Sequence, residues 1–70
     1  MKIGKDRHHR RCKSNGGHNS PNNISIVERV KHNAFHTLFG NKTTEEIAEV
    51  LNLVWIDPTY ILIVKEKDHA

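Results

Sequence analysis

The features that this chain lacks indicate in which cellular compartment it works. A single cysteine, Cys12, excludes an intrachain disulfide and fits a reducing, cytoplasmic compartment. The N-terminus, MKIGKDRHHRR, is charged and has no apolar stretch, so we expect no secretory signal peptide. No apolar run approaches the roughly 20 residues of a membrane span, and the longest, YILIV at 60–64, has the length of a strand. We therefore expect a cytoplasmic protein without a membrane partner.

Apolar residues are also scarce. Hydrophobic residues make up 36% of the 70-residue chain, which is thin for a compact fold. A chain of this length forms at most one small domain, 1–70, and buries a modest core. A bound metal or a partner chain would add to the stability of such a domain.

Charge is unevenly distributed along the chain. The net charge is +3, but residues 1–13 hold six basic residues and one acid, whereas 43–70 hold two basic residues and six acids. The basic end coincides with two adjacent histidines, and a positive patch beside a candidate site indicates an anionic ligand, most commonly nucleic acid. A solvated basic tail is the alternative.

Turn-forming residues divide the first half of the chain. The stretch SNGGHNSPNN, at 14–23, predicts a loop. Flanking segments at about Arg7–Lys13 and Ile24–Val27 are predicted to be extended, which gives a β-hairpin with a long loop. A helix is predicted from about Glu28 to Phe39, ended by Gly40.

Helical spacing predicts a second helix over 43–56. Thr43 and Glu46 form a capping-box pattern at its start, and Asp57-Pro58 ends it. We expect this supporting helix to cover the core of the first unit with its apolar residues, Ile47, Val50, Leu51, Val54 and Trp55. A last strand is predicted at Tyr60–Val64, followed by a frayed tail, KEKDHA.

Histidine is concentrated in one window of the chain. Five of the six histidines lie between residues 8 and 36. His32 and His36 are four apart on the first predicted helix, with Cβ atoms about 6 Å apart, a spacing that can chelate one metal. Plain boundary residues are the alternative. The helical period places the pair at the edge of an apolar arc formed by Val30, Ala34, Leu38, Phe35 and Phe39.

The hairpin supplies further polar residues in a distinctive order. His8-His9, thirteen residues, Asn23, eight residues, His32, three residues and His36 together resemble the HNH endonuclease family. The resemblance is closest to the form with adjacent front histidines and a His-x-x-x-His pair, seen in colicin-type DNases. Gly16-Gly17 in the loop also agrees. The resemblance covers about residues 7–39, just under half of the chain.

This resemblance implies an α+β, ββα-metal fold and a single-metal phosphodiesterase. His8, His32 and His36 would hold one divalent metal, and His9 would be the general base that activates water. Asn23 would hydrogen-bond near His9 and fix the hairpin loop. In a flat strand, His8 and His9 point to opposite faces, so both serve one site only if the strand twists or bulges, or if the site straddles its edge.

The metal and its surroundings follow from ligand chemistry. Imidazole suits Zn²⁺, Ni²⁺, Co²⁺ or Mn²⁺ better than Mg²⁺, which prefers oxygen. Many family members carry cysteine pairs for a structural zinc, which one cysteine cannot form. In an extended strand Cys12 lies about 13 Å from His8, so a packing role for Cys12 is favoured over that of a fourth metal ligand.

Three arginines flank the histidines: Arg7, Arg10 and Arg11. They are candidate phosphate ligands, or alternatively solvated charges on an edge strand.

The leading hypothesis is an HNH endonuclease that cleaves DNA with one divalent metal. The resemblance suggests a 5′-phosphate product and an origin in a phage or mobile element. The small size predicts weak sequence specificity, or specificity supplied by a partner or by dimerisation. One alternative is a non-catalytic nucleic-acid-binding module stapled by metal. Another is a subunit of a larger assembly in which YILIV adds a strand to a partner or to its own copy.

Overall fold

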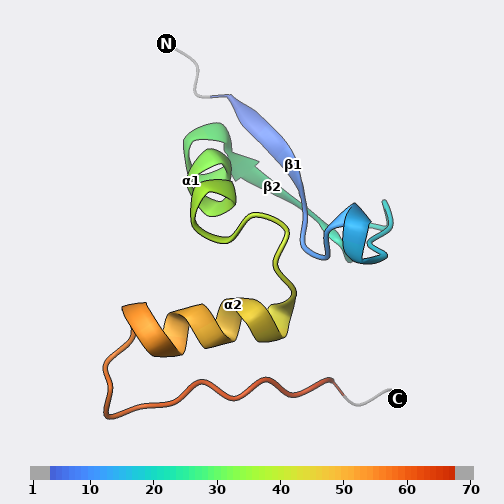
Figure 1. The fold of residues 1–70 in the computed structure, drawn as a ribbon. Helices are drawn as coiled ribbons and strands as arrows, with labels where there is room; N and C mark the ends of the chain where they lie inside the picture. Colours follow the sequence, from blue (N-terminus) through green and yellow to red (C-terminus); the bar gives the residue numbers. More distant parts are fainter. Residues whose placement is uncertain (1–3, 68–70) are drawn as a thin grey trace.

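The computed structural model describes residues 4–67, which form a small α+β unit (Figure 1). It contains a two-stranded antiparallel sheet and helices. The elements in chain order are β1 (Lys5–His9), a 3₁₀ turn (Lys13–Asn15), β2 (Ile24–Glu28), α1 (Arg29–Phe39), α2 (Thr44–Val50) and a π-helical continuation (Leu51–Trp55).

The predicted hairpin is present, with shifted ends. The ladder runs from Lys5 opposite Glu28 to His9 opposite Ile24, so the first strand starts and ends earlier than the expected Arg7–Lys13. The chain leaves the ladder after His9 because it turns through the 3₁₀ segment. Gly17 packs against the backbone there, where a Cβ would overlap the Arg11 carbonyl.

Helix α1 follows β2 directly and packs on one face of the hairpin. One of its contacts is made by Phe35, whose ring lies 4.8 Å from that of His8 between centroids. The hairpin covers only part of the expected apolar arc, because Val30 is 74% exposed and Leu38 is 46% exposed. A hairpin of two strands is narrow, so it covers only one strip of the helix.

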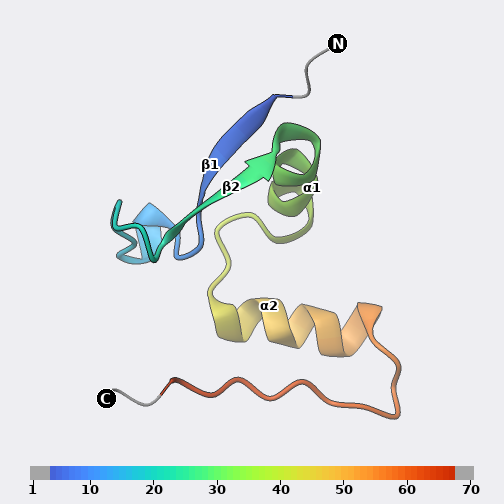
Figure 2. The ribbon, with the colours of Figure 1, turned by 180° about the vertical axis from the view of Figure 1, so that it is seen from behind.

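The second helix does not cover the first unit, which corrects another expectation. Figures 1 and 2 show α2 in a separate layer, away from the hairpin and α1. A bond from the Asn15 side-chain amide to the Asn41 carbonyl, 2.8 Å long, ties the hairpin loop to the connection before α2. The predicted 43–56 helix is present as α2 and its π-helical continuation, together with the residues that cap them.

The predicted strand at Tyr60–Val64 is not formed within the described residues. After Asp57-Pro58 the chain runs back beside the helix, where the Asn52 side chain accepts from the Leu62 N–H (2.8 Å) and donates to its carbonyl (3.0 Å). An extended segment becomes a strand only by pairing with another backbone. We call residues 44–67 the C-terminal arm. Within the predicted tail, residues 65–67 are irregular and 68–70 lie outside the described residues.

The fold is open. Its radius of gyration is 14.0 Å, against about 11 Å expected for a compact chain of this length. Across residues 4–67 no side chain, apolar or polar, is fully buried. Among the same residues, no helix combines the length and apolar character needed to cross a bilayer.

Candidate metal centre

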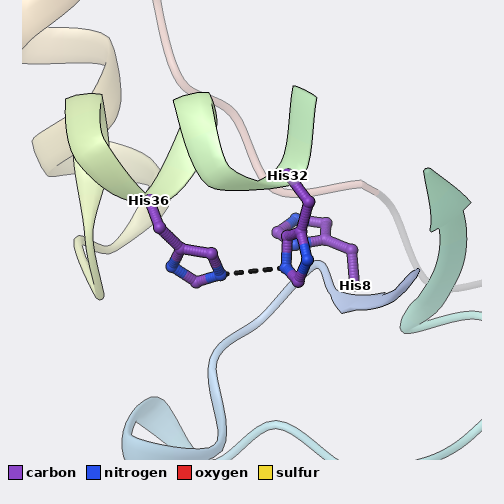
Figure 3. A group of neighbouring side chains, drawn as sticks. All are labelled: His8, His32 and His36. Carbon is purple, nitrogen blue, oxygen red and sulfur yellow. Dashed lines mark hydrogen bonds between the residues drawn. The ribbon is translucent and has the colours of Figure 1, made fainter. Parts of the chain in front are cut away.

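Three imidazoles meet where the hairpin packs on α1. His8 comes from β1 and His32 and His36 from successive turns of α1, and one ring nitrogen from each lies within 4.8 Å of the others (Figure 3). The residues predicted from sequence as metal ligands are therefore brought together. Cys12 is not part of this group; it lies half-buried at the start of the 3₁₀ turn.

The cluster has one packed side and one open side. The ring of His8 meets those of His32 and Phe35 edge-on, at centroid distances of 5.2 and 4.8 Å. His32 is half-buried, with 18% of its side chain exposed, whereas His36 is exposed. A ligand could therefore approach from the His36 side.

An acidic residue that sequence reasoning missed orients the cluster. Asp6 Oδ2 lies 3.1 Å from His32 Nδ1, and Asp6 Oδ1 accepts a 3.1 Å bond from Arg29 Nε. These bonds, that from His32 first, hold the pKa of Asp6 below its ordinary value. A signal was present, since Asp6 stands two residues before His8 and side chains two apart share a strand face.

The ionised carboxylate also determines where the protons lie. A carboxylate only accepts, so His32 Nδ1 carries a proton and donates it to Asp6. In a neutral His32 ring the lone pair then lies on Nε2, the atom that lies 2.9 Å from His36 Nε2. This carboxylate–histidine pairing is the arrangement that commonly orients a metal-binding imidazole.

The surroundings of His8 favour its neutral form. Burial lowers its pKa most, and the neighbouring His32 and His36 lower it further. Since metal ligands must be deprotonated, this is the form that binds an ion.

The three rings suit a divalent transition metal. Two nitrogens that bind one zinc at 2.0–2.1 Å in tetrahedral geometry lie about 3.3 Å apart. The nitrogens here already lie within 4.8 Å of each other, so small side-chain rotations would bring them to that spacing. Three ligands with one open side would leave a coordination position for a further molecule.

His9 is not one of the three residues whose ring nitrogens converge. It ends β1, and its Nε2 lies 2.7 Å from Oδ1 of Asn19 in the hairpin loop. An amide oxygen only accepts, so Nε2 carries the proton and Nδ1 keeps a lone pair. The two front histidines thus have different partners: the His8 ring contacts rings on α1, whereas His9 is bonded to the hairpin loop.

Asn23 pins the hairpin loop. Its side chain accepts from the Arg11 N–H (2.6 Å) and donates to the carbonyls of Arg11 (3.0 Å) and His18 (2.8 Å). Its own carbonyl accepts from the Arg10 N–H at 2.7 Å. These bonds fasten the chain just after His9 to the start of β2.

The three candidate phosphate ligands are divided between two surfaces. Arg7 is exposed and pairs with Ile26, on the hairpin face turned away from α1. Arg10 and Arg11 follow β1, and the Arg10 side chain reaches the Asn22 carbonyl at 3.2 Å. This second pair lines an open depression between the loop and the C-terminal arm. Its other charged residues are Lys42, Lys65, Lys67, Glu45 and Glu66, so basic residues outnumber acids and we call it the cationic depression.

Comparison with known proteins adds no relative. No protein family, no curated protein and no solved structure matches this chain. What the chain does must therefore be inferred from its own residues and their arrangement.

Proposed function

We propose that this chain is an HNH-type endonuclease that hydrolyses phosphodiester bonds in DNA with one divalent metal ion. The observation that carries the proposal is the convergence of His8, His32 and His36 from a β-hairpin and the helix that follows it. His9 and Asn23, the other two residues of the motif, lie at the end of the same hairpin.

In this proposal three imidazoles share the task of binding the metal. His8, His32 and His36 would hold the ion, and the bond to Asp6 would keep the His32 ring oriented for it. When bound, a divalent ion supplies Lewis-acid stabilisation of the negative charge that develops on the phosphate and the leaving oxygen. The exposed side of the cluster, at His36, admits the phosphate.

His9 is the proposed general base. Its Nδ1 atom would accept a proton from the attacking water, a task that imidazole side chains commonly perform in enzymes. The bond to Asn19 holds the ring, and the Asn23 bonds hold the strand end that carries it. His9 is thus the catalytic residue, while Asn19 and Asn23 are positioning residues.

The cationic depression supports nucleic acid as the substrate. Arg10 and Arg11 lie on the strand extension that carries His9, and both are exposed for contact with phosphate oxygens. A chain of 70 residues has little surface for reading bases, so we expect weak sequence specificity and products with a 5′-phosphate.

Two histidine substitutions test the mechanism. In His9→Ala, plasmid cleavage should fall by about 10²–10⁴-fold while zinc binding by calorimetry is unchanged. In His32→Ala, zinc binding itself should weaken. The matched control is His18→Ala, because the imidazole of that exposed loop residue makes no hydrogen bond to the described residues. Full cleavage by purified His9→Ala protein would refute this mechanism.

The cationic depression also favours a second function, a nucleic-acid-binding module that does not cut. Here the histidines would hold a structural ion, while Arg10, Arg11 and Lys42 bind phosphates. A gel shift that weakens steeply with salt, with no cleavage in any divalent ion, would favour this alternative.

A further inference from the structure

The C-terminal arm presents a large uncovered apolar surface. In its extended segment Ile61 is 72% and Ile63 is 82% exposed. The neighbouring exposed residues are Leu53, Val54, Trp55, Tyr60, Leu62 and Val64. Exposed apolar side chains in this number are typical of an interaction surface.

The chain exposes more surface than a compact monomer of its mass, and the excess is large enough for a protein interface. The chain exposes 6305 Å², against about 4,500 Å² for a compact monomer of its mass. The difference, about 1,800 Å², exceeds the ~800 Å² that one partner gives to a standard interface. The excess exposed surface is therefore more than enough to supply one ordinary interface.

The backbone of the arm has one occupied edge and one free edge. Leu62 directs its N–H and C=O at the Asn52 side chain. In an extended chain successive residues direct these groups to opposite edges, so those of Ile61 and Ile63 face away from the helix. Neither residue's N–H or C=O has a hydrogen-bond partner among residues 4–67.

We propose that a second copy of this chain covers this edge by antiparallel strand pairing about a two-fold axis at Leu62. In this register Ile61 of each copy lies opposite Ile63 of the other, and both direct their backbone groups at the partner. Two such pairs give four hydrogen bonds. Leu62 faces its own copy as a non-hydrogen-bonded pair, which is consistent with its existing bonds to Asn52.

Side chains and charges agree with this register. Tyr60 lies opposite Val64, an aromatic–β-branched pair of the kind that stabilises sheets. Parallel pairing in register would place Lys65 beside Lys65. Antiparallel pairing instead brings the lysine-bearing end of one copy beside the end of the other that carries Asp57. The interface is self-complementary, as in most homodimers.

Proline substitutions test the free edge. The full chain should sediment with twice its mass of 8.1 kDa. Ile63→Pro, which removes an N–H that faces the partner, should shift it to the monomer. Val64→Pro is the matched control, because that N–H faces the helix side, and it should remain a dimer. A monomeric wild type at millimolar concentration, or a dimeric Ile63→Pro, would overturn the proposal.

Disulfide trapping tests the register without relying on the proline variants. In a Cys12→Ser background, Leu62→Cys should form a disulfide-linked dimer, since non-hydrogen-bonded pairs have Cα atoms about 4.5 Å apart. Tyr60→Cys should not, because Tyr60 lies about 13 Å from its own copy. Equal cross-linking of both variants would exclude this pairing. Neither readout depends on nuclease activity.

Discussion

A single carboxylate, Asp6, decides how the histidine cluster is arranged. It links β1 to α1 through His32 and Arg29, and it fixes which nitrogen of His32 carries the proton. Without it, the His32 ring could take either tautomer and rotate away from His8.

We therefore expect Asp6→Asn to weaken zinc binding by about 10–100-fold, as loss of an orienting partner does elsewhere. Competition with a chromophoric chelator measures the change directly. The matched control is Glu28→Gln, which removes a nearby negative charge that pairs with Lys31 at 3.1 Å. An equal loss in both variants would show that net charge, not orientation, is responsible.

Asn23 has a structural role that is measurable without a metal. Replacing it with alanine removes three side-chain hydrogen bonds in the loop. For a half-exposed side chain we expect the free energy of unfolding to fall by about 1–2 kcal/mol, measured by urea denaturation. Asn22→Ala is the control, because only its backbone carbonyl is bonded. Equal stability of the two variants would contradict this role.

At the scale of elements, the start of α2 is set by local chemistry. Thr43 Oγ1 accepts from the Glu46 N–H at 3.2 Å, and the Glu46 carboxylate accepts from the Thr43 N–H at 2.9 Å. The backbone bond from Thr43 is the main cause that lowers the pKa of Glu46 below its ordinary value of 4.5.

This capping box predicts a pH dependence. A lowered pKa means that the bond stabilises the folded state fully above about pH 4.5 and is lost as the pH falls through the folded value. Asp6 and Asp57 titrate in the same range, so the difference between variants is the quantity to measure. Between pH 6 and 2, Glu46→Gln should lose less helical circular dichroism than wild type. Glu45→Gln, outside the box, should behave like wild type.

At the scale of the whole molecule, the open core makes a bound ion important to stability. A metal that binds the folded state at 100 times its dissociation constant adds about 2.7 kcal/mol. We expect zinc to raise the urea midpoint of the wild type and of His18→Ala, and to have little effect on His32→Ala. An equal rise in all three would place the ion elsewhere.

Much of the first half of the fold could be predicted from local sequence. Turn formers located the hairpin loop, and the i, i+4 spacing of His32 and His36 placed two nitrogens side by side. The limits of the strands were less predictable, because the 3₁₀ turn and the tight packing at Gly17 depend on the other side of the loop.

Local spacing was thus sufficient for the hairpin, both helices, the capping box and the pairing of His32 with His36, because each rests on neighbours in sequence or on strand and helix period. The third imidazole, His8, came from the family resemblance, because its meeting with α1 is a tertiary contact. The partnership of Asp6 with His32, the outward turn of Val30 and Leu38, and the unpaired edge at Ile61 and Ile63 emerged only in the folded chain. They depend on which distant segments meet, and a hairpin of two strands leaves one face of α1 and the whole C-terminal arm without a partner.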